Sequence, residues 1–415
     1  MFKKIVSLML VVAMCATLCI AMASCADVGT TDGDVIASPL PLKDIKTDVT
    51  VPEDFKIGFI FLHDENSTYD ANFINAAKRA KEIFGLTDDQ MIIKVNIGEN
   101  NDCYNAAIDL ADSGCDIVFA DSFGHEQFMI QAAQDRPDTQ FCHATGTRAH
   151  TENLANYHNA FASIYQGRYL AGIAAGLKLN EMIESKKITA EEAVMGYVGA
   201  FTYAEVISGL SSFYLGAKSV CPSVTMKVQF TGSWYDEGKE QEAANALLSK
   251  GCVLISQHAD SMGAPSACEI AGVPNVSYNG STIAACPETF IVSSAINWTP
   301  YFVYIIESCI KGEAIAADWC GGIEEGSVVL SDINGAVAAE GTIEKINAAI
   351  EGLKNGTVKV FDSNTFTKGG APVTTYTVED TFEVIKDGEF SESTFRSAPY
   401  FDIQMDGIEF LNAMY

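Results

Sequence analysis

The stretch "CDIVFADSF", residues 115–123, decides the class of fold. It is a nearly continuous apolar run that ends in the polar pair Asp121 and Ser122. A strand with both faces buried has this apolar composition, because neither of its faces is exposed to solvent and polar residues do not alternate along it. Such strands belong to parallel sheets that helices cover, so the stretch predicts an α/β protein.

The segments around this strand alternate between strand and helix, as βαβ units require. In the first part of the chain we expect strands at 55–62, 91–98, 115–123 and 139–144, and helices at 70–84, 103–113, 125–134 and 161–179. A second series predicts strands at 193–200, 225–232, 252–258, 274–280 and 289–296, and helices at 204–217, 236–250, 263–271 and 299–312.

Because the two series have similar length and the same order, they predict two Rossmann-like lobes with parallel sheets joined by a hinge. We expect lobe 1 to span 55–165 and lobe 2 to span 166–296. Residues 297–415 are expected to complete lobe 1 after the hinge, with a helix at 342–354.

The first 54 residues are predicted to lie outside the lobes. Lys3 and Lys4 precede an apolar run that ends in Ala23-Ser24-Cys25, which is typical of a secretory signal at 1–24 with a lipidated Cys25 after it. A plain transmembrane anchor is the alternative. Residues 25–54 lack periodicity and predict a tether, so we expect a lipid anchor at the extracytoplasmic face of the cell membrane.

Composition argues against several classes of function. The formal net charge of -28 is of the wrong sign for a nucleic-acid partner. Nine cysteines follow Cys25, an odd and scattered set without a C-x-x-C pair, so neither a disulfide framework nor a metal site is expected. No G-x-S-x-G turn, metal-ligand cluster or aspartate cluster is present, so we expect no enzyme, no catalytic residue and no cofactor.

Aromatic and small polar residues follow almost every predicted strand, where ligands of open parallel sheets collect. This mixture suits a planar heterocycle with polar edges, a sugar or a nucleoside. A phosphate group is not expected, because no glycine-rich phosphate loop occurs. The candidate ligand-binding residues are Tyr69, Asn72, Phe73, Ser122, Phe123, Thr145, Glu205, Trp234, His258, Asp260, Asn279 and Trp298.

Several of these residues have a second interpretation. Phe73 fits the core of a helix as well as a ligand contact, and Trp234 fits a hydrophobic staple before the next helix. Asp260 could cap a helix or hold ligand hydroxyl groups. Trp298, in "INWTPYFVYII" (296–306), could touch a ligand ring or support the hinge.

Three motifs carry a resemblance to a known family: "YQGRYLAGIAAGL" (165–177), "GYVGAF" (196–201) and the segment 232–261. They resemble the basic membrane protein family, the lipoprotein substrate-binding components of ABC importers, which include purine nucleoside receptors. The resemblance spans about 55–330 and implies the type I periplasmic-binding-protein fold. It also implies that Tyr69, Asn72, Ser122, Phe123, Trp234, Asp260 and Trp298 border the cleft.

Many nucleoside receptors of that family carry Asp-Lys-Ser-Phe-Asn after the first strand, whereas this chain reads "HDENSTYDANF" (63–73) and lacks the lysine. The expected function is a lipid-anchored solute-binding protein of an ABC importer, which would bind a purine nucleoside or purine base between its lobes and deliver it to a permease. A ligand sensor for a signalling receptor, and a binding protein for a sugar or another small polar solute, are the alternatives.

Overall fold

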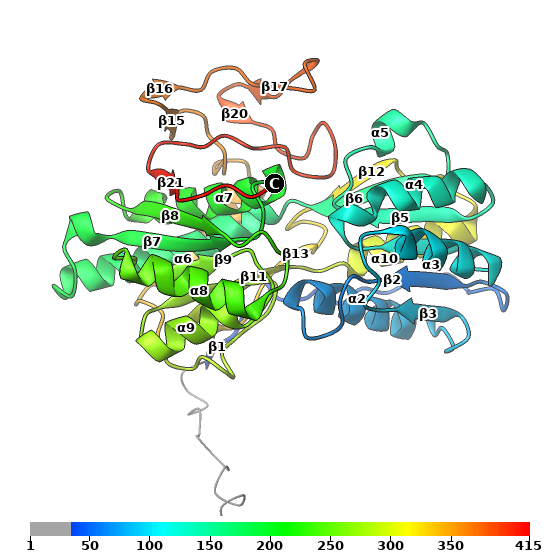
Figure 1. Ribbon diagram of the computed structural model, residues 1–415, viewed down its shortest axis with the longest axis horizontal. Coiled ribbons are helices and arrows are strands. Elements are labelled where there is room, and N and C mark those ends of the chain that lie inside the picture. The colour runs from blue at the N-terminus through cyan, green and yellow to red at the C-terminus, as the bar shows by residue number, and fades with distance from the viewer. Residues whose placement is uncertain (1–34) are drawn as a thin grey trace, which may run out of the picture.

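The computed structural model describes residues 35–415, and it shows two α/β lobes side by side (Figure 1). The predicted signal at 1–24, Cys25 and the first part of the predicted tether lie outside the described residues. Within residues 35–415, no helix is long and apolar enough to span a membrane. The nine cysteines of this part are free thiols, and seven of them are buried.

Lobe 1 is built on a six-stranded parallel sheet. Its strand order is β12 (Asp318–Gly321), β6 (Tyr157–Ala162), β5 (Gln140–Ala144), β4 (Ile117–Ala120), β2 (Ile57–Ile60) and β3 (Met91–Lys94). Helices α2 (Thr68–Phe84) and α10 (Thr299–Lys311) cover one face, and α3 (Asn101–Asp112) and α4 (Glu126–Asp135) cover the other. The stretch at 115–123 supplies β4, which is buried at every position, as its composition predicted.

Lobe 2 is built on a seven-stranded sheet in which only β13 is antiparallel to its neighbour. Its strand order is β13 (Val328–Leu330), β11 (Phe290–Ile296), β10 (Asn275–Tyr278), β9 (Leu254–Gln257), β7 (Val194–Gly199), β8 (Thr225–Phe230) and β21 (Ile408–Phe410). Helices α6 (Ile164–Glu184) and α7 (Ala204–Val220) cover one face, and α8 (Glu237–Ser249) and α9 (Gly263–Ala271) cover the other. The predicted fold class is thereby confirmed.

The glycines of α6 and α7 let these two helices approach backbone to backbone. A Cβ atom on Gly172 would lie 2.1 Å from the carbonyl oxygen of Phe213, and one on Gly216 would lie 2.0 Å from that of Tyr169. Neither atom can move away, because both belong to helix backbone. The Ala- and Gly-rich composition of this segment is therefore a requirement of close helix packing.

Between β2 and β13 the chain crosses between the lobes at three places: after β6, after β11 and between β12 and β13. Neighbouring crossings are hydrogen-bonded, since Ser163 N donates to Gly321 O (2.9 Å) and Asn297 N donates to Ser327 O (2.8 Å). The three crossings therefore lie together and form the hinge between the lobes.

Two of the predicted boundaries are corrected. The helix expected at 161–179 begins at Ile164, because residues 157–162 form β6, a central strand whose polar His158 and Asn159 are buried between β5 and β12. Residues 297–415, which were expected to complete lobe 1, contribute to both lobes. They supply α10 and β12 to lobe 1, but β13 and β21 pair with strands of lobe 2.

The remaining elements are short or peripheral. They are η1 (Phe123–His125), α5 (Ala149–Glu152), η2 (Ala190–Glu192), β1 (Val35–Ile36) paired with β14 (Ile333–Asn334), α11 (Thr342–Lys354), and the hairpins β15 (Thr367–Lys368) with β16 (Ala371–Pro372), β17 (Thr377–Val378) with β18 (Phe382–Glu383), and β19 (Ile385–Lys386) with β20 (Glu389–Phe390). The helix expected at 342–354 is α11, which packs on α6.

A buried arginine ties α6 to the strands of lobe 2. The guanidinium of Arg168 is fully buried and donates to Ser256 Oγ (2.9 Å), Tyr197 Oη (3.2 Å), and the carbonyl oxygens of Gln257 and Ser277 (3.3 Å each). Its central carbon also lies 4.9 Å from the centre of the Tyr278 ring. The charge is thus held by dipoles and aromatic faces.

Arg168→Ala should lower the free energy of unfolding by about 2–4 kcal/mol, because it leaves a void and several buried acceptors without a donor. Urea denaturation measures this loss. Arg136→Ala is the matched control, since Arg136 pairs with Asp112 at the surface (Nε–Oδ1 2.7 Å), and it should change the stability far less. Equal losses in the two variants would contradict this role for Arg168.

Candidate functional site

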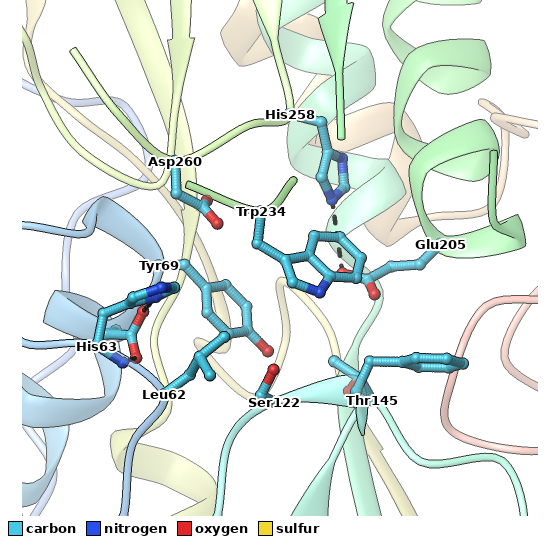
Figure 2. Close-up of a pocket in the computed structure, with 11 residues that line it drawn as sticks. Leu62, His63, Tyr69, Ser122, Thr145, Glu205, Trp234, His258 and Asp260 are labelled. Atoms are coloured by element: carbon cyan, nitrogen blue, oxygen red, sulfur yellow. Dashed lines mark hydrogen bonds and ion pairs between the residues drawn. The ribbon is translucent and has the colours of Figure 1, made fainter. Parts of the chain in front are cut away.

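A small cavity lies between the lobes, where the strands of both sheets have their carboxyl ends. Side chains of both lobes point into it (Figure 2). Its lining residues are Leu62, His63, Tyr69, Asp70, Ser122, Phe123 and Thr145 of lobe 1, and Glu205, Trp234, His258 and Asp260 of lobe 2.

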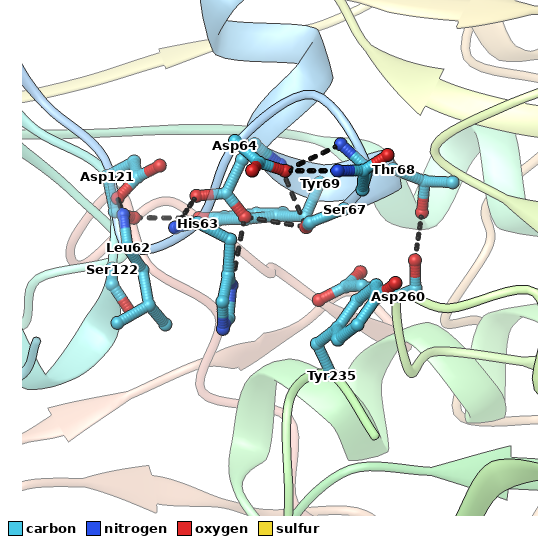
Figure 3. Close-up of polar contacts among 12 residues, drawn as sticks. Leu62, His63, Asp64, Ser67, Thr68, Tyr69, Asp121, Ser122, Tyr235 and Asp260 are labelled. Carbon is cyan, nitrogen blue, oxygen red and sulfur yellow. Dashed lines mark hydrogen bonds and ion pairs between the residues drawn. The ribbon is translucent and has the colours of Figure 1, made fainter. Parts of the chain in front are cut away.

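The first loop of lobe 1 is fixed by the buried carboxylate of Asp70. This carboxylate accepts from His63 N (2.7 Å) and from Ser67 Oγ (2.6 Å), and Ser67 in turn caps α2 (Figure 3). Tyr69 follows in the first turn of the helix and donates its hydroxyl to the carbonyl of Asp121 (2.9 Å). Because the hydroxyl is already engaged, Tyr69 offers the cavity its ring.

Two neighbouring carboxyl groups beneath this loop carry opposite pKa shifts. Burial raises the pKa of Asp121 well above its ordinary value, and the charge of Asp70 raises it further. Burial also acts to raise the pKa of Asp70, but hydrogen bonds from His63, Asp121 and Ser67 outweigh it, and the pKa is lowered. These directions favour the ionised form of Asp70 and the protonated form of Asp121.

The ends of β4 and β5 are held by buried polar contacts. Ser122 Oγ donates to Glu99 Oε1 (2.6 Å), and the carbonyl of Ser122 lies 2.7 Å from His143 Nε2. His143 is thus a structural histidine. Thr145 has a φ of +67°, a left-handed conformation that costs a threonine energy and occurs at binding and active sites.

Lobe 2 contributes carboxylates and an imidazole. Asp260 is 5% exposed; its Oδ1 accepts from Asn279 Nδ2 (3.2 Å), and its backbone N donates to Trp234 O (3.0 Å). Burial raises its pKa well above the ordinary value, followed by the charge of Glu240. His258 Nε2 lies 3.6 Å from Glu205 Oε1, and both side chains face the cavity (Figure 2).

Four aromatic rings form a ladder, which we call the aromatic wall: Trp234, Phe201, Tyr203 and Phe123. The first and last rings line the cavity, and the two between them lie outside its lining. Successive ring centres lie 4.9, 5.1 and 5.3 Å apart, and the last contact, between Tyr203 and Phe123, joins lobe 2 to lobe 1. Phe201 and Tyr203 were not among the predicted site residues. The signal that could have identified them is their position directly after β7.

The lobes are in contact around the cavity, so the cleft is closed. Thr68 donates to the carbonyl of Asp260 from both its backbone N (3.2 Å) and its hydroxyl (3.0 Å). Asn72 Nδ2 donates to Asn279 O (3.1 Å) and Asn279 Oδ1 (3.2 Å). These bonds join the N-terminal half of α2 to the strand ends of lobe 2.

The structure brings eight of the twelve predicted site residues to the cavity: Tyr69, Ser122, Phe123, Thr145, Glu205, Trp234, His258 and Asp260. Asn72 and Asn279 lie outside its lining and bond to each other across the cleft, where they line a second hollow beside the hinge. Leu62, His63 and Asp70 line the cavity although they were not predicted. They belong to the loop that follows β2, as does Tyr69.

Phe73 and Trp298 lie in the core of lobe 1, away from the cavity lining. Trp298 is 1% exposed, and its ring stacks on Phe73 with centres 4.4 Å apart and planes 21° from parallel. It stands at the N-cap of α10, directly after the second crossing. The structure thus places this indole in the core of lobe 1, packed against Phe73 of α2, and not in the lining of the cavity.

Comparison with known proteins agrees with this architecture. The family of ABC transporter substrate-binding proteins described as PnrA-like matches residues 61–363. The chain belongs to this family. A relative named "Purine-binding protein BAB2_0673", from Brucella abortus, is 29% identical over 326 residues, which cover 77% of this chain and 88% of that protein.

A second relative, "Putative ABC transporter glucose-binding protein TsgA13" from Haloferax volcanii, is 34% identical over 256 residues. The match covers 62% of this chain and 61% of the length of that protein. Among solved structures, an ABC transporter solute-binding protein from Conexibacter woesei has a TM-score of 0.59 at 22% identity, over 74% of this chain and 98% of the other, which supports the fold.

The lining of the cavity combines polar and aromatic side chains. Its polar groups are carboxylates, hydroxyls and imidazoles, and none of the eleven lining residues is Lys or Arg. Within residues 35–415, no group of three or more His, Cys, Asp or Glu is placed to hold a metal ion. The cavity therefore offers carboxylate oxygens, two imidazoles and aromatic faces to a ligand, and no Lys or Arg to an anionic group.

Trp234→Ala should weaken ligand binding by roughly 1–3 kcal/mol, by analogy with base–aromatic stacking, and should leave the stability nearly unchanged. Trp298→Ala, the matched control, should lower the free energy of unfolding by about 3–5 kcal/mol, because it empties a core position. Calorimetric titration and urea denaturation measure the two effects. A loss of affinity at folded Trp298→Ala that equals the loss at Trp234→Ala would contradict the assignment.

Proposed function

We propose that the protein is the extracytoplasmic receptor of an ABC importer and binds a purine nucleoside or purine base in the cavity between its lobes. One observation carries this proposal: in a closed cleft, the indole of Trp234 lies beside the carboxyl groups of Asp260 and Glu205, with no Lys or Arg in the lining. A flat ring with hydroxyl or amine donors at its edges complements this arrangement.

Trp234 and Tyr69 supply aromatic surface for the heterocycle. Asp260, whose Oδ1 accepts from Asn279, has a second carboxyl oxygen for a ribose hydroxyl or a ring amine. A phosphate or carboxylate on the ligand would meet Glu205 and Asp260 without a counter-charge, at a cost that increases with burial. We therefore expect nucleosides and bases to bind and nucleotides to be excluded.

The purine-binding relative supports the class of ligand, since this chain covers 88% of its length. Closing of the lobes would bury the ligand and form the surface that a permease recognises. A lipid on Cys25 would hold the receptor at the membrane. The predicted tether is shorter than expected, because residues from 35 on lie against the lobes: β1 pairs with β14, and Thr47 Oγ1 donates to Glu307 Oε1 (2.6 Å). We therefore propose that the site binds a solute for transport and does not catalyse a reaction.

A sugar is the second candidate ligand, favoured by the relative named as a glucose-binding protein. Hydroxyl donors of a sugar would also pair with Asp260 and Glu205, and an aromatic face would cover one side of its ring. The two candidates differ in shape: a purine is a planar aromatic heterocycle, whereas a sugar ring is not.

A ligand screen by thermal unfolding and calorimetry tests the proposal. Guanosine, adenosine, inosine or a purine base should raise the melting temperature, and a ligand at 100 times its Kd stabilises by about 2.7 kcal/mol. The corresponding nucleoside monophosphate is the matched control and should have no effect. Stabilisation by D-glucose without any response to purines would reject the purine and favour the sugar.

The proposed anchor has a separate test. Cys25→Ser should release the protein from the membrane fraction, because the serine cannot carry the thioether-linked lipid. Fractionation of cells followed by mass measurement of the released chain checks this outcome. Full retention of the Cys25→Ser protein in membranes would contradict lipid anchoring at this residue.

A further inference from the structure

Residues 364–415 lie beyond the part of the chain that the family matches, which ends at 363. They form the orange-to-red path along the upper side of Figure 1, from the hairpins near β15 to β21. The segment is well packed: Phe401 is fully buried, and its ring stacks on Phe361 at 4.3 Å between centres. We refer to residues 364–415 as the interlobe strap.

The interlobe strap is bonded to the sheet and to a helix of lobe 2. Strand β21 pairs in parallel with β8, and the amide of Asn412 bonds both backbone groups of Phe230 (2.8 and 2.9 Å). Near the start of α7, Ser208 Oγ donates to Glu392 Oε2 (2.7 Å). These contacts make the strap an added edge of lobe 2.

The last residues of the strap reach the aromatic wall. The backbone N of Met414 donates to Thr202 Oγ1 (2.8 Å), and the backbone N of Thr202 donates to Met414 O (2.7 Å). Thr202 stands between Phe201 and Tyr203, which are two of the four rings of the wall. The backbone that carries these rings is therefore fixed by the strap.

The same strap is also bonded to lobe 1. Ser397 donates to Asp318 Oδ1 of β12 from its backbone N (2.9 Å) and from its hydroxyl (2.7 Å). The ring of Phe395 lies 4.9 Å from that of His150 in α5, and His150 Nε2 lies 3.4 Å from Glu379 Oε2. Because β12 and α5 belong to lobe 1, the strap spans both lobes.

We propose that the interlobe strap is a positioning element of the ligand site, which holds the two lobes in the closed arrangement and fixes the aromatic wall. A segment bonded to β8 and to β12 resists any motion that separates these strands. It raises the population of the closed state, and with it the apparent affinity for ligand. The effect on affinity rests on the proposed function, whereas the effect on lobe closure does not.

Scattering of X-rays by the ligand-free protein tests the strap without any ligand. Asp318→Ala removes the acceptor for Ser397, and Asn412→Ala removes the bonds to Phe230, so both should shift the radius of gyration to larger values. Asp318→Asn keeps an acceptor oxygen and should restore the compact form. Asn364→Ala is the matched control, because Asn364 bonds only Asp362 within an exposed turn.

A ligand measurement separates positioning from a merely structural role. With guanosine as the probe, Asp318→Ala should lose about threefold to tenfold in affinity, through faster dissociation, while Asp318→Asn and Asn364→Ala retain it. If Asn412→Ala fails to fold, the two Asp318 variants decide. Radii of gyration that stay equal in wild type and Asp318→Ala overturn the proposal. An expanded Asp318→Ala protein supports the strap even where guanosine binds to no form.

Discussion

Closure of the cleft depends on the contact between Thr68 and the carbonyl of Asp260, in which the first residue of α2 donates twice to the opposite lobe. The N-terminus of a helix has unsatisfied N–H groups, and here one of them finds an acceptor in lobe 2. The contact sets the distance between Tyr69, the next residue of α2, and Trp234, whose carbonyl accepts from Asp260 N. This contact and the bonds between Asn72 and Asn279 hold the two halves of the cavity face to face.

Burial of carboxyl groups shapes what the closed cavity can hold. The pKa of Asp260 is raised well above its ordinary value by burial, with further contributions from the charges of Glu240 and Asp70. A ligand that donates hydrogen bonds relieves this cost, whereas an anionic ligand increases it. Under the proposed function, the acidic lining would select the ligand by charge and the aromatic faces would select it by shape.

Most of the fold could be predicted from the sequence, because β4 and its neighbours are continuous apolar runs and the helices between them are periodic. The strand β6 was missed because "YHNAFA" carries two polar residues that only a central strand between β5 and β12 can bury. The interlobe strap could not be predicted, since its strands have two or three residues and no period is visible at that length.

The site was predictable to the extent that strand ends gather at one edge of a parallel sheet. That rule located Trp234 and Asp260, but it does not say which way a side chain turns after the strand. Trp298 also follows a strand, yet it turns under α2 and stacks on Phe73. Likewise Asn72 lies close to Tyr69 along α2, but it faces Asn279 rather than the cavity. Orientation of this kind depends on the packing of the two lobes.

Hydrogen–deuterium exchange of the protein with and without guanosine tests the central claim, that the lobes close on a purine nucleoside. The amide of Thr68 bonds lobe 2 only in the closed form, so guanosine should slow its exchange together with that of residues 258–261. Protection of both lobes at once is the result predicted here. Protection confined to one lobe, or none with guanosine while D-glucose protects both, would contradict it.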